Sequence, residues 1–204
     1  PFTVTGLNAS SYYDFYLRDS CSATELSQWI GPTVASTACD TALAPYFENF
    51  DVGFNPGTNP AGAQNVGSTI SPCWTRDDDT LYFWGGGQGQ TPTGGTGPFG
   101  DHTSGNGNYV YVESSFAAGG TTATLETPFI NLDSLNQPEL RFWYQMWEAN
   151  GSQGKLVWEI DSGNGYLKLD SLEGSQGFAW QEIVMDIRQY AGATVKVRFE
   201  ATKS

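Results

Sequence analysis

The feature that most constrains the fold is a series of short segments in which apolar and polar residues alternate between turn signals. In the segment 139–146, alternation places Leu140, Phe142, Tyr144 and Met146 on one face of a strand. No segment carries a sustained helical period. The sequence therefore predicts an all-β, antiparallel β-sandwich. Further strands are predicted at 47–50, 82–84, 109–114, 123–126, 155–161, 180–186 and 194–200.

The first 38 residues form a separate segment with its own strand pattern. Strands are predicted at 2–7, 12–18 and 31–37. Three strands build a poor core alone, so this segment is expected to need further strands. Residues 39–46 are interpreted as a linker, and residues 47–204 as the main domain.

The charge balance excludes two classes of partner. The net charge is −13, with 9 Lys and Arg against 22 Asp and Glu. Without a basic cluster the chain cannot displace counterions from nucleic acid, and an anionic membrane surface would repel it. No run of about 20 apolar residues is present to span a bilayer. The abundance of Gly and aromatic residues is typical of a secreted β-protein.

A set of ordered motifs resembles one extracellular family. The motifs are Phe47–Asp51, Cys73–Arg76, Asp79–Trp84, Gly97–Thr103, Leu125–Pro128, Leu140–Met146, Trp180–Glu182 and Phe199–Ala201. In this order they resemble the MAM domain of meprins, neuropilins and mu-type receptor tyrosine phosphatases, over roughly residues 45–204. The resemblance implies a jelly-roll sandwich, an adhesion or recognition role without catalysis, and a last strand beyond Ser204.

The N-terminal segment is similar to the last three strands of a fibronectin type III domain. The similarity is carried by the Gly6-Leu7 turn, the strand at 12–18, Trp29 and the Gly31-Pro32 start of the final strand. It implies a partial immunoglobulin-like sandwich over residues 1–38. A tandem of this kind is similar to bacterial surface and secreted multidomain proteins, including adhesins and modular hydrolases.

Residues suited to catalysis do not form a recognisable pattern. The one histidine, His102, directly follows Asp101, which is poor geometry for an orienting carboxylate, and no Gly-x-Ser-x-Gly elbow occurs. His102 is interpreted as a loop residue that secures the entry to the next strand. Glu113, Glu148 and Glu159 are spread over separate strands or strand ends, as on a solvated face. We expect no enzyme activity in this segment.

Calcium is the predicted cofactor, in a structural role. Ca²⁺ takes six to eight hard oxygens, and the predicted ligands are Glu48, Asp51, Asp79 and Asp101. The family resemblance implies a cation beside the opening Phe-Glu segment, which places Glu48 in the set. Two alternatives stay open: the acidic run 77–79 as a solvated turn, and Asp101 as a cap for loop amides.

Two aromatic surfaces are candidates for ligand binding. The outward face of the strand at 139–146 and the next residue carry Arg141, Trp143, Gln145 and Trp147. Flat rings with amide and guanidinium groups are suited to sugars, although Trp143 could instead pack beneath a loop. Tyr109 and Tyr111 share a face with Glu113 and form the second candidate.

The three cysteines allow one pairing to be favoured. Cys21 and Cys39 would lie past opposite ends of neighbouring antiparallel strands, about 20 Å apart at ~3.3 Å per residue, which is beyond disulfide reach. We therefore predict a Cys39–Cys73 bridge, roughly where the MAM family has its N-terminal disulfide.

The function expected from these observations is a cation-stabilised, non-catalytic adhesion or recognition module of a secreted or cell-surface multidomain protein. Its expected partners are an extracellular protein or glycan and other domains of the same chain. Two alternatives are a carbohydrate-binding accessory module of a polysaccharide-degrading enzyme and an ancillary domain of a secreted peptidase.

Overall fold

The computed structural model describes residues 3–20, 22, 25–57, 67–71, 73–77, 82–115, 117–148 and 154–204 of the chain. The chain divides into two compact units, residues 1–40 and 41–204. Cys21, Asp78 and Asp79 lie outside the described residues. Within the described part, none of the helical segments has the length and hydropathy needed to cross a membrane.

The first unit contains one antiparallel pair of strands, β1 (Tyr12–Leu17) and β2 (Ile30–Ser36). Both match the predicted strands closely. The strand predicted at 2–7 is wrong for residues 3–7, which are irregular. Directly after this segment, the Asn8 N–H donates to the Tyr13 hydroxyl at 2.7 Å.

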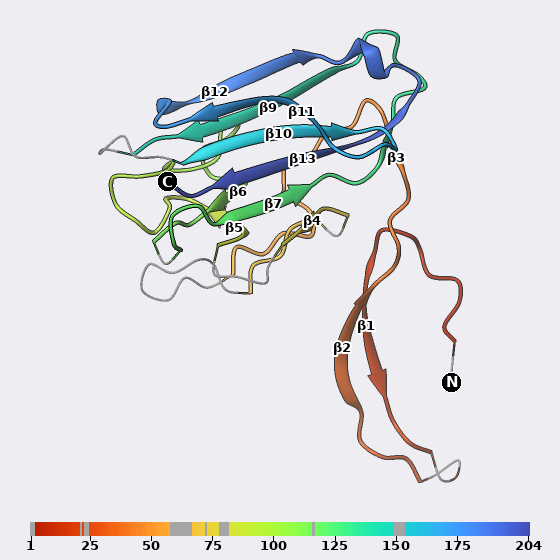
Figure 1. Cartoon of the computed structure of the whole chain (residues 1–204). Coiled ribbons are helices and arrows are strands. Elements are labelled where there is room, and N and C mark those ends of the chain that lie inside the picture. Colours follow the sequence, from red (N-terminus) through yellow and green to blue (C-terminus); the bar gives the residue numbers. More distant parts are fainter. Residues whose placement is uncertain are drawn as a thin grey trace. The chain divides into compact units, whose positions relative to one another are not determined.

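The second unit is a β-sandwich whose larger sheet has the strand order β11-β10-β13-β7-β4, with β3 and β8 joined to it (Figure 1). The bounds are β3 (Ala42–Leu43), β4 (Thr75–Arg76), β7 (Thr122–Glu126), β8 (Ile130–Asn131), β10 (Lys155–Asp161), β11 (Leu167–Glu173) and β13 (Thr194–Thr202). All pairs are antiparallel except β3 with β8. Strand content and topology confirm the predicted all-β sandwich.

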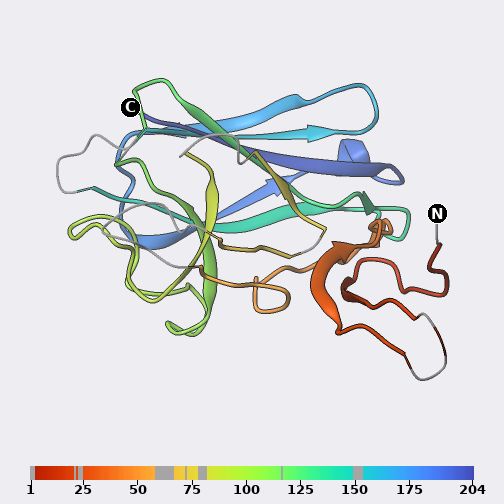
Figure 2. The same ribbon diagram turned by 90° about the horizontal axis from the view of Figure 1, so that it is seen from below.

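The other layer is made of two strand pairs, β9–β12 and β5–β6 (Figure 2). Their bounds are β5 (Trp84–Gln88), β6 (Asn108–Val112), β9 (Glu139–Met146) and β12 (Gly177–Asp186). Tyr144 of β9 packs with Leu156 and Trp158 of β10 in the core between the layers. A 3₁₀ helix, Arg188–Tyr190, joins β12 to β13.

The predicted opening strand at 47–50 is wrong. Residues 47–50 form a turn in which Glu48 Oε1 accepts the Phe50 N–H at 2.7 Å and Asn49 Oδ1 accepts the Asp51 N–H at 3.1 Å. Phe50 has a φ of 60°, which no strand residue adopts. The side-chain oxygens thus take the amides that a sheet ladder would need.

The predicted linker at 39–46 includes ordered structure of the second unit. Ala42 pairs with Ile130, and Leu43 with Asn131, in the short parallel pair β3–β8. The N–H of Ala42 donates to the Phe129 carbonyl at 2.8 Å. Ala42 and Leu43 of this segment therefore form a short edge strand joined to the larger sheet through β8.

Candidate functional site: an aromatic face and a tyrosine-lined cavity

A cluster of aromatic side chains lies on the outer side of the β9–β12 pair, and we call it the aromatic face. It consists of Phe99, His102, Trp143, Trp147 and Phe178. Its existence follows from alternation along β9: Tyr144 is buried in the core, while Trp143, on the opposite face, is 44% exposed. This confirms the predicted division of the strand into a core face and an outward face.

Ring contacts join the residues of the aromatic face into two groups, His102 with Trp143 and Phe178 with Trp147 and Phe99. The His102 ring stacks on Trp143 with centroids 3.5 Å apart and planes inclined by 13°. Phe178 packs edge-on against both Trp147, at 5.1 Å, and Phe99, at 5.5 Å. Edge-on contacts of this kind suit the ring quadrupoles. The large exposed area of Phe99 and Phe178 remains open to a partner.

The Gly-rich loop after β5 is fixed across this surface by polar contacts. The Trp180 indole N–H donates to the Gly100 carbonyl at 3.1 Å. The Gly97 N–H donates to the Trp147 carbonyl at 3.3 Å, and Thr96 and Glu148 form an isolated β-bridge. The loop that carries His102 is thus joined to β12 and to the residues that directly follow β9.

The polar members of the predicted platform have other contacts. Gln145 Nε2 donates to the Phe178 carbonyl at 3.1 Å and so links β9 to β12. Arg141 forms ion pairs with Glu139 at 2.7 Å and Glu182 at 3.7 Å. These pairs are exposed, so they add little stability. Gln145 therefore contacts Phe178, as Trp147 does, whereas Arg141 lies in a charged group of its own.

Phe99 and Phe178 were missed by the sequence reasoning. Phe178 lies just before the predicted strand at 180–186. The register of β12 with β9 places Gly177 opposite Met146, the residue before Trp147. An extended alternation from Trp180 back to Phe178 was the signal that could have revealed it. Nothing in the local pattern marks Phe99.

Asp101 is the central acceptor of the loop. Its Oδ2 accepts the N–H groups of Thr103 and Ser104 at 2.9 Å each, and its Oδ1 accepts the Gly107 N–H at 2.6 Å and the Ser104 hydroxyl at 2.9 Å. Burial alone would raise the pKa of Asp101, but these donors favour the charged form and hold the pKa below its ordinary value. Asp101 therefore has the geometry of a cap for the loop amides, the alternative to a role as a calcium ligand.

Glu48 and Asp51, the other predicted calcium ligands among the described residues, also have N–H or O–H donors. Glu48 Oε2 accepts the Tyr46 hydroxyl at 3.2 Å. The Asn108 amide donates to Asp51 Oδ1 and to the Phe50 carbonyl, both at 3.2 Å. Among the residues that the structure describes, no group of three or more His, Cys, Asp or Glu could hold a metal. The described oxygens therefore do not form a ready calcium site, and calcium stays a prediction.

Replacing Asp101 with Asn should destabilise the second unit by about 1–2 kcal/mol at neutral pH, because an amide cannot accept from all these donors. Since the pKa of Asp101 is lower in the folded chain, its contribution is complete above the unfolded value of about 3.9. That contribution is lost as the pH falls through the folded value. Urea unfolding of wild type and Asp101→Asn between pH 2 and pH 7 should therefore converge at the acid end.

Asp14→Asn, which removes the same charge from an exposed position in β1, is the matched control and should show no such convergence. Thermal unfolding in millimolar calcium and in a chelator tests whether calcium stabilises the fold. The calcium prediction requires a higher melting temperature in calcium, and requires Glu48→Gln and Asp101→Asn to remove that gain. Equal melting temperatures would show that the loop is held by its own donors.

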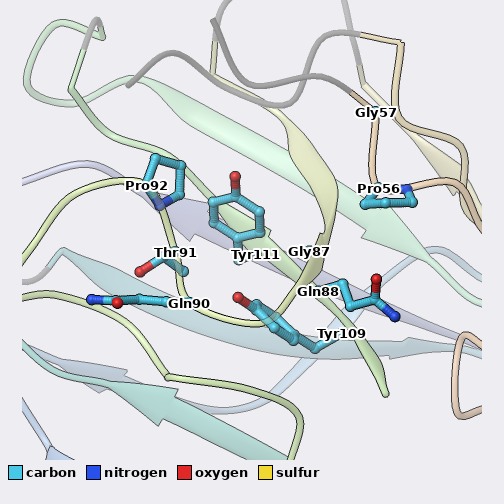
Figure 3. A pocket seen from close by; sticks show the side chains of 9 residues that line it. All are labelled: Pro56, Gly57, Gly87, Gln88, Gln90, Thr91, Pro92, Tyr109 and Tyr111. Atoms are coloured by element: carbon cyan, nitrogen blue, oxygen red, sulfur yellow. The ribbon is translucent and has the colours of Figure 1, made fainter. Parts of the chain in front are cut away.

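Tyr109 and Tyr111, the second predicted platform, line a cavity of about 170 Å³ beside the β5–β6 pair (Figure 3). The described residues that line it are Pro56, Gly57, Gly87, Gln88, Gln90, Thr91, Pro92, Tyr109 and Tyr111. The Tyr109 hydroxyl donates to the Gly89 carbonyl at 2.7 Å. Glu113 is not among these lining residues: it is buried and accepts from the N–H and hydroxyl of Ser115.

Cys39 and Cys73 are both disulfide-bonded, as the predicted bridge requires. Beside Cys73, Trp74 stacks on Phe199 with centroids 6.5 Å apart and donates its indole N–H to the Tyr46 hydroxyl at 2.9 Å. These contacts fix the segment after Cys73 to the larger sheet.

Comparison with known proteins decides the family. The model of the MAM domain, described as meprin/A5/mu, matches residues 67–204. The chain belongs to the MAM family. Neuropilin-1a of Danio rerio is 29% identical over 154 residues, which are 74% of this chain and 16% of that protein. MAM domain-containing protein 2 of Mus musculus is 30% identical over 131 residues, 64% of this chain and 18% of that protein.

The MAM match covers much of the second unit and neither strand of the first unit. The adhesin domain K1 of Lys-gingipain from Porphyromonas gingivalis W83 overlaps 77% of this chain and 87% of its own, with a TM-score of 0.49 and 20% identity. The chain spans less than a fifth of the length of the two curated MAM relatives.

Proposed function

We propose that this MAM domain is a non-catalytic recognition module of an extracellular multidomain protein, and that it binds a partner protein through the aromatic face. The observation that supports this proposal most directly is the exposure of Phe99 and Phe178, which pack against each other, and of Trp143 on the outward face of β9. Aromatic side chains are enriched at protein interfaces and dominate their binding energy.

The geometry favours a protein over a glycan at the aromatic face. Phe178 contacts Trp147 and Phe99 edge-on, with planes inclined by 90° and 60°, so these rings present an irregular apolar surface. A sugar ring stacks best on a single flat face, whereas an uneven apolar surface suits the side chains of a protein. The acidic chain favours a partner with Lys or Arg around its own apolar contact.

Residues that could have served in catalysis have structural contacts. Glu159 is paired with Arg198 at 2.6 Å, and Glu113 accepts from Ser115. His102 is stacked on Trp143. These contacts support a module whose activity is recognition, and family membership supports an extracellular location.

Phe178→Ala and Trp143→Ala should each weaken partner binding about 10-fold or more, as expected for a loss of about 1.4 kcal/mol or more at an interface aromatic. The probe is an array of purified extracellular protein domains, with affinities measured by biolayer interferometry. Leu167→Ala is the matched control, because Leu167 is an exposed apolar residue on the edge strand β11. Binders unaffected by both aromatic variants, or an array without binders, would contradict the proposal.

A further inference from the structure

The cavity beside β5–β6 combines features that the aromatic face lacks. None of its described lining residues is charged, although the chain as a whole carries a net charge of −13. Its walls offer two phenol rings, the amides of Gln88 and Gln90, and the rings of Pro56 and Pro92 (Figure 3). A ligand that matches such walls is neutral, with both apolar C–H surface and hydrogen-bonding groups.

The Tyr111 hydroxyl adds a specific requirement. Its oxygen is buried and has no hydrogen-bond partner among the described residues. A buried polar group without a partner destabilises the folded chain. Burial, the nearby Glu113 carboxylate and Tyr109 raise the pKa of Tyr111, so the phenol keeps its proton and can donate. A ligand oxygen at this wall would supply the missing acceptor.

The size of the cavity limits the ligand further. An apolar cavity of about 150 Å³ in an engineered protein holds one benzene molecule, so a cavity of about 170 Å³ has room for one six-membered ring. A pyranose is a neutral six-membered ring with C–H faces for tyrosine and hydroxyls for amides. A peptide segment would need a longer groove.

We propose that this cavity binds a single neutral pyranose residue, as the end of a glycan chain, with Tyr111 donating to a sugar oxygen. The rings of Tyr109 and Tyr111 contact the sugar C–H groups, and Gln90 hydrogen-bonds its hydroxyls. The site shares no residue with the aromatic face, so glycan binding adds a second activity to the proposed protein recognition.

The test is ligand-observed NMR of the whole chain with the methyl glycosides of glucose, galactose, mannose and N-acetylglucosamine, followed by titration of any that bind. We expect at least one glycoside to bind. Tyr111→Phe and Gln90→Ala should each weaken its binding at least 5-fold. Tyr111→Phe should leave the melting temperature unchanged or raised, since it removes an unpaired hydroxyl.

Tyr144→Phe is the matched control, because the Tyr144 hydroxyl contacts Gln181 at 3.2 Å outside the cavity. It should leave glycoside binding unchanged. Absence of binding by all four glycosides overturns the proposal, as does binding that Tyr111→Phe and Gln90→Ala leave intact. Either result is independent of the protein array, since Phe178→Ala and Trp143→Ala should not affect sugar binding.

Discussion

Replacing Trp158 with Ala should destabilise the second unit by about 3–5 kcal/mol, the largest effect we expect from one substitution. Trp158 is 1% exposed and lies between Phe142, at 5.3 Å, and the other residues of the core cluster. Truncation leaves a cavity where two layers meet. Total stabilities of about 5–15 kcal/mol are usual, so the variant should be partly unfolded at 37 °C.

Urea unfolding followed by fluorescence measures this loss, and Trp158→Phe refines it. The Trp158 indole nitrogen has no hydrogen-bond partner among the described residues, so the phenyl ring keeps much of the packing and removes an unpaired N–H. Trp158→Phe should therefore cost clearly less than Trp158→Ala. The exposed Trp143→Ala is the control and should cost no more than about 1.5 kcal/mol, the value of an aromatic pair. Equal losses at positions 143 and 158 would contradict this account of the core.

Loss of the disulfide should have the second-largest effect. A bridge between Cys39 and Cys73 closes a loop of about 34 residues, which corresponds to about 3–4 kcal/mol in the chain-entropy model. Cys39→Ser and Cys73→Ser should each lower stability by this amount, and the double variant should cost no more than either single one. Thermal unfolding with and without reductant gives the same comparison for the wild type.

Peptide mapping without reduction identifies the pair directly, and we expect the peptides that contain Cys39 and Cys73 to be recovered as one species. Cys21→Ser is the control and should leave the melting temperature unchanged. Recovery of a Cys21–Cys39 peptide would refute the strand-geometry argument that separated these two residues.

The strands that the sequence predicted well are those in which apolar and polar residues alternate without interruption. The bounds of β9 and β10 match the predicted strands at 139–146 and 155–161, because alternation there is uninterrupted. Strand β11 was missed because Leu169 is an extra residue where the register with β10 shifts, so Leu169 and Leu172 both reach the core. A bulge of this kind breaks the alternation of apolar and polar residues from which a strand is predicted.

Side-chain to backbone bonding explains the errors at the candidate site. Residues 47–50 were predicted as a strand because they resemble the opening strand of the MAM family, but Glu48 and Asn49 accept backbone N–H groups two residues away. The outward position of Trp143 followed from periodicity alone. Its partner His102 arrives from a distant loop, and no local pattern encodes that contact.

Gly87 of β5 determines which mutation would close the cavity. A methyl group at Gly87 would meet the Tyr109 ring at 2.7 Å, and one at Gly86 would meet the Phe54 ring at 2.5 Å. Gly87 lines the cavity, so this part of the wall exists because a side chain is missing. In most sites a mutation removes function by deleting a group; here the gain of one carbon would crowd the tyrosines. A lineage could lose this hollow through a single glycine-to-alanine change while its aromatic face stayed intact.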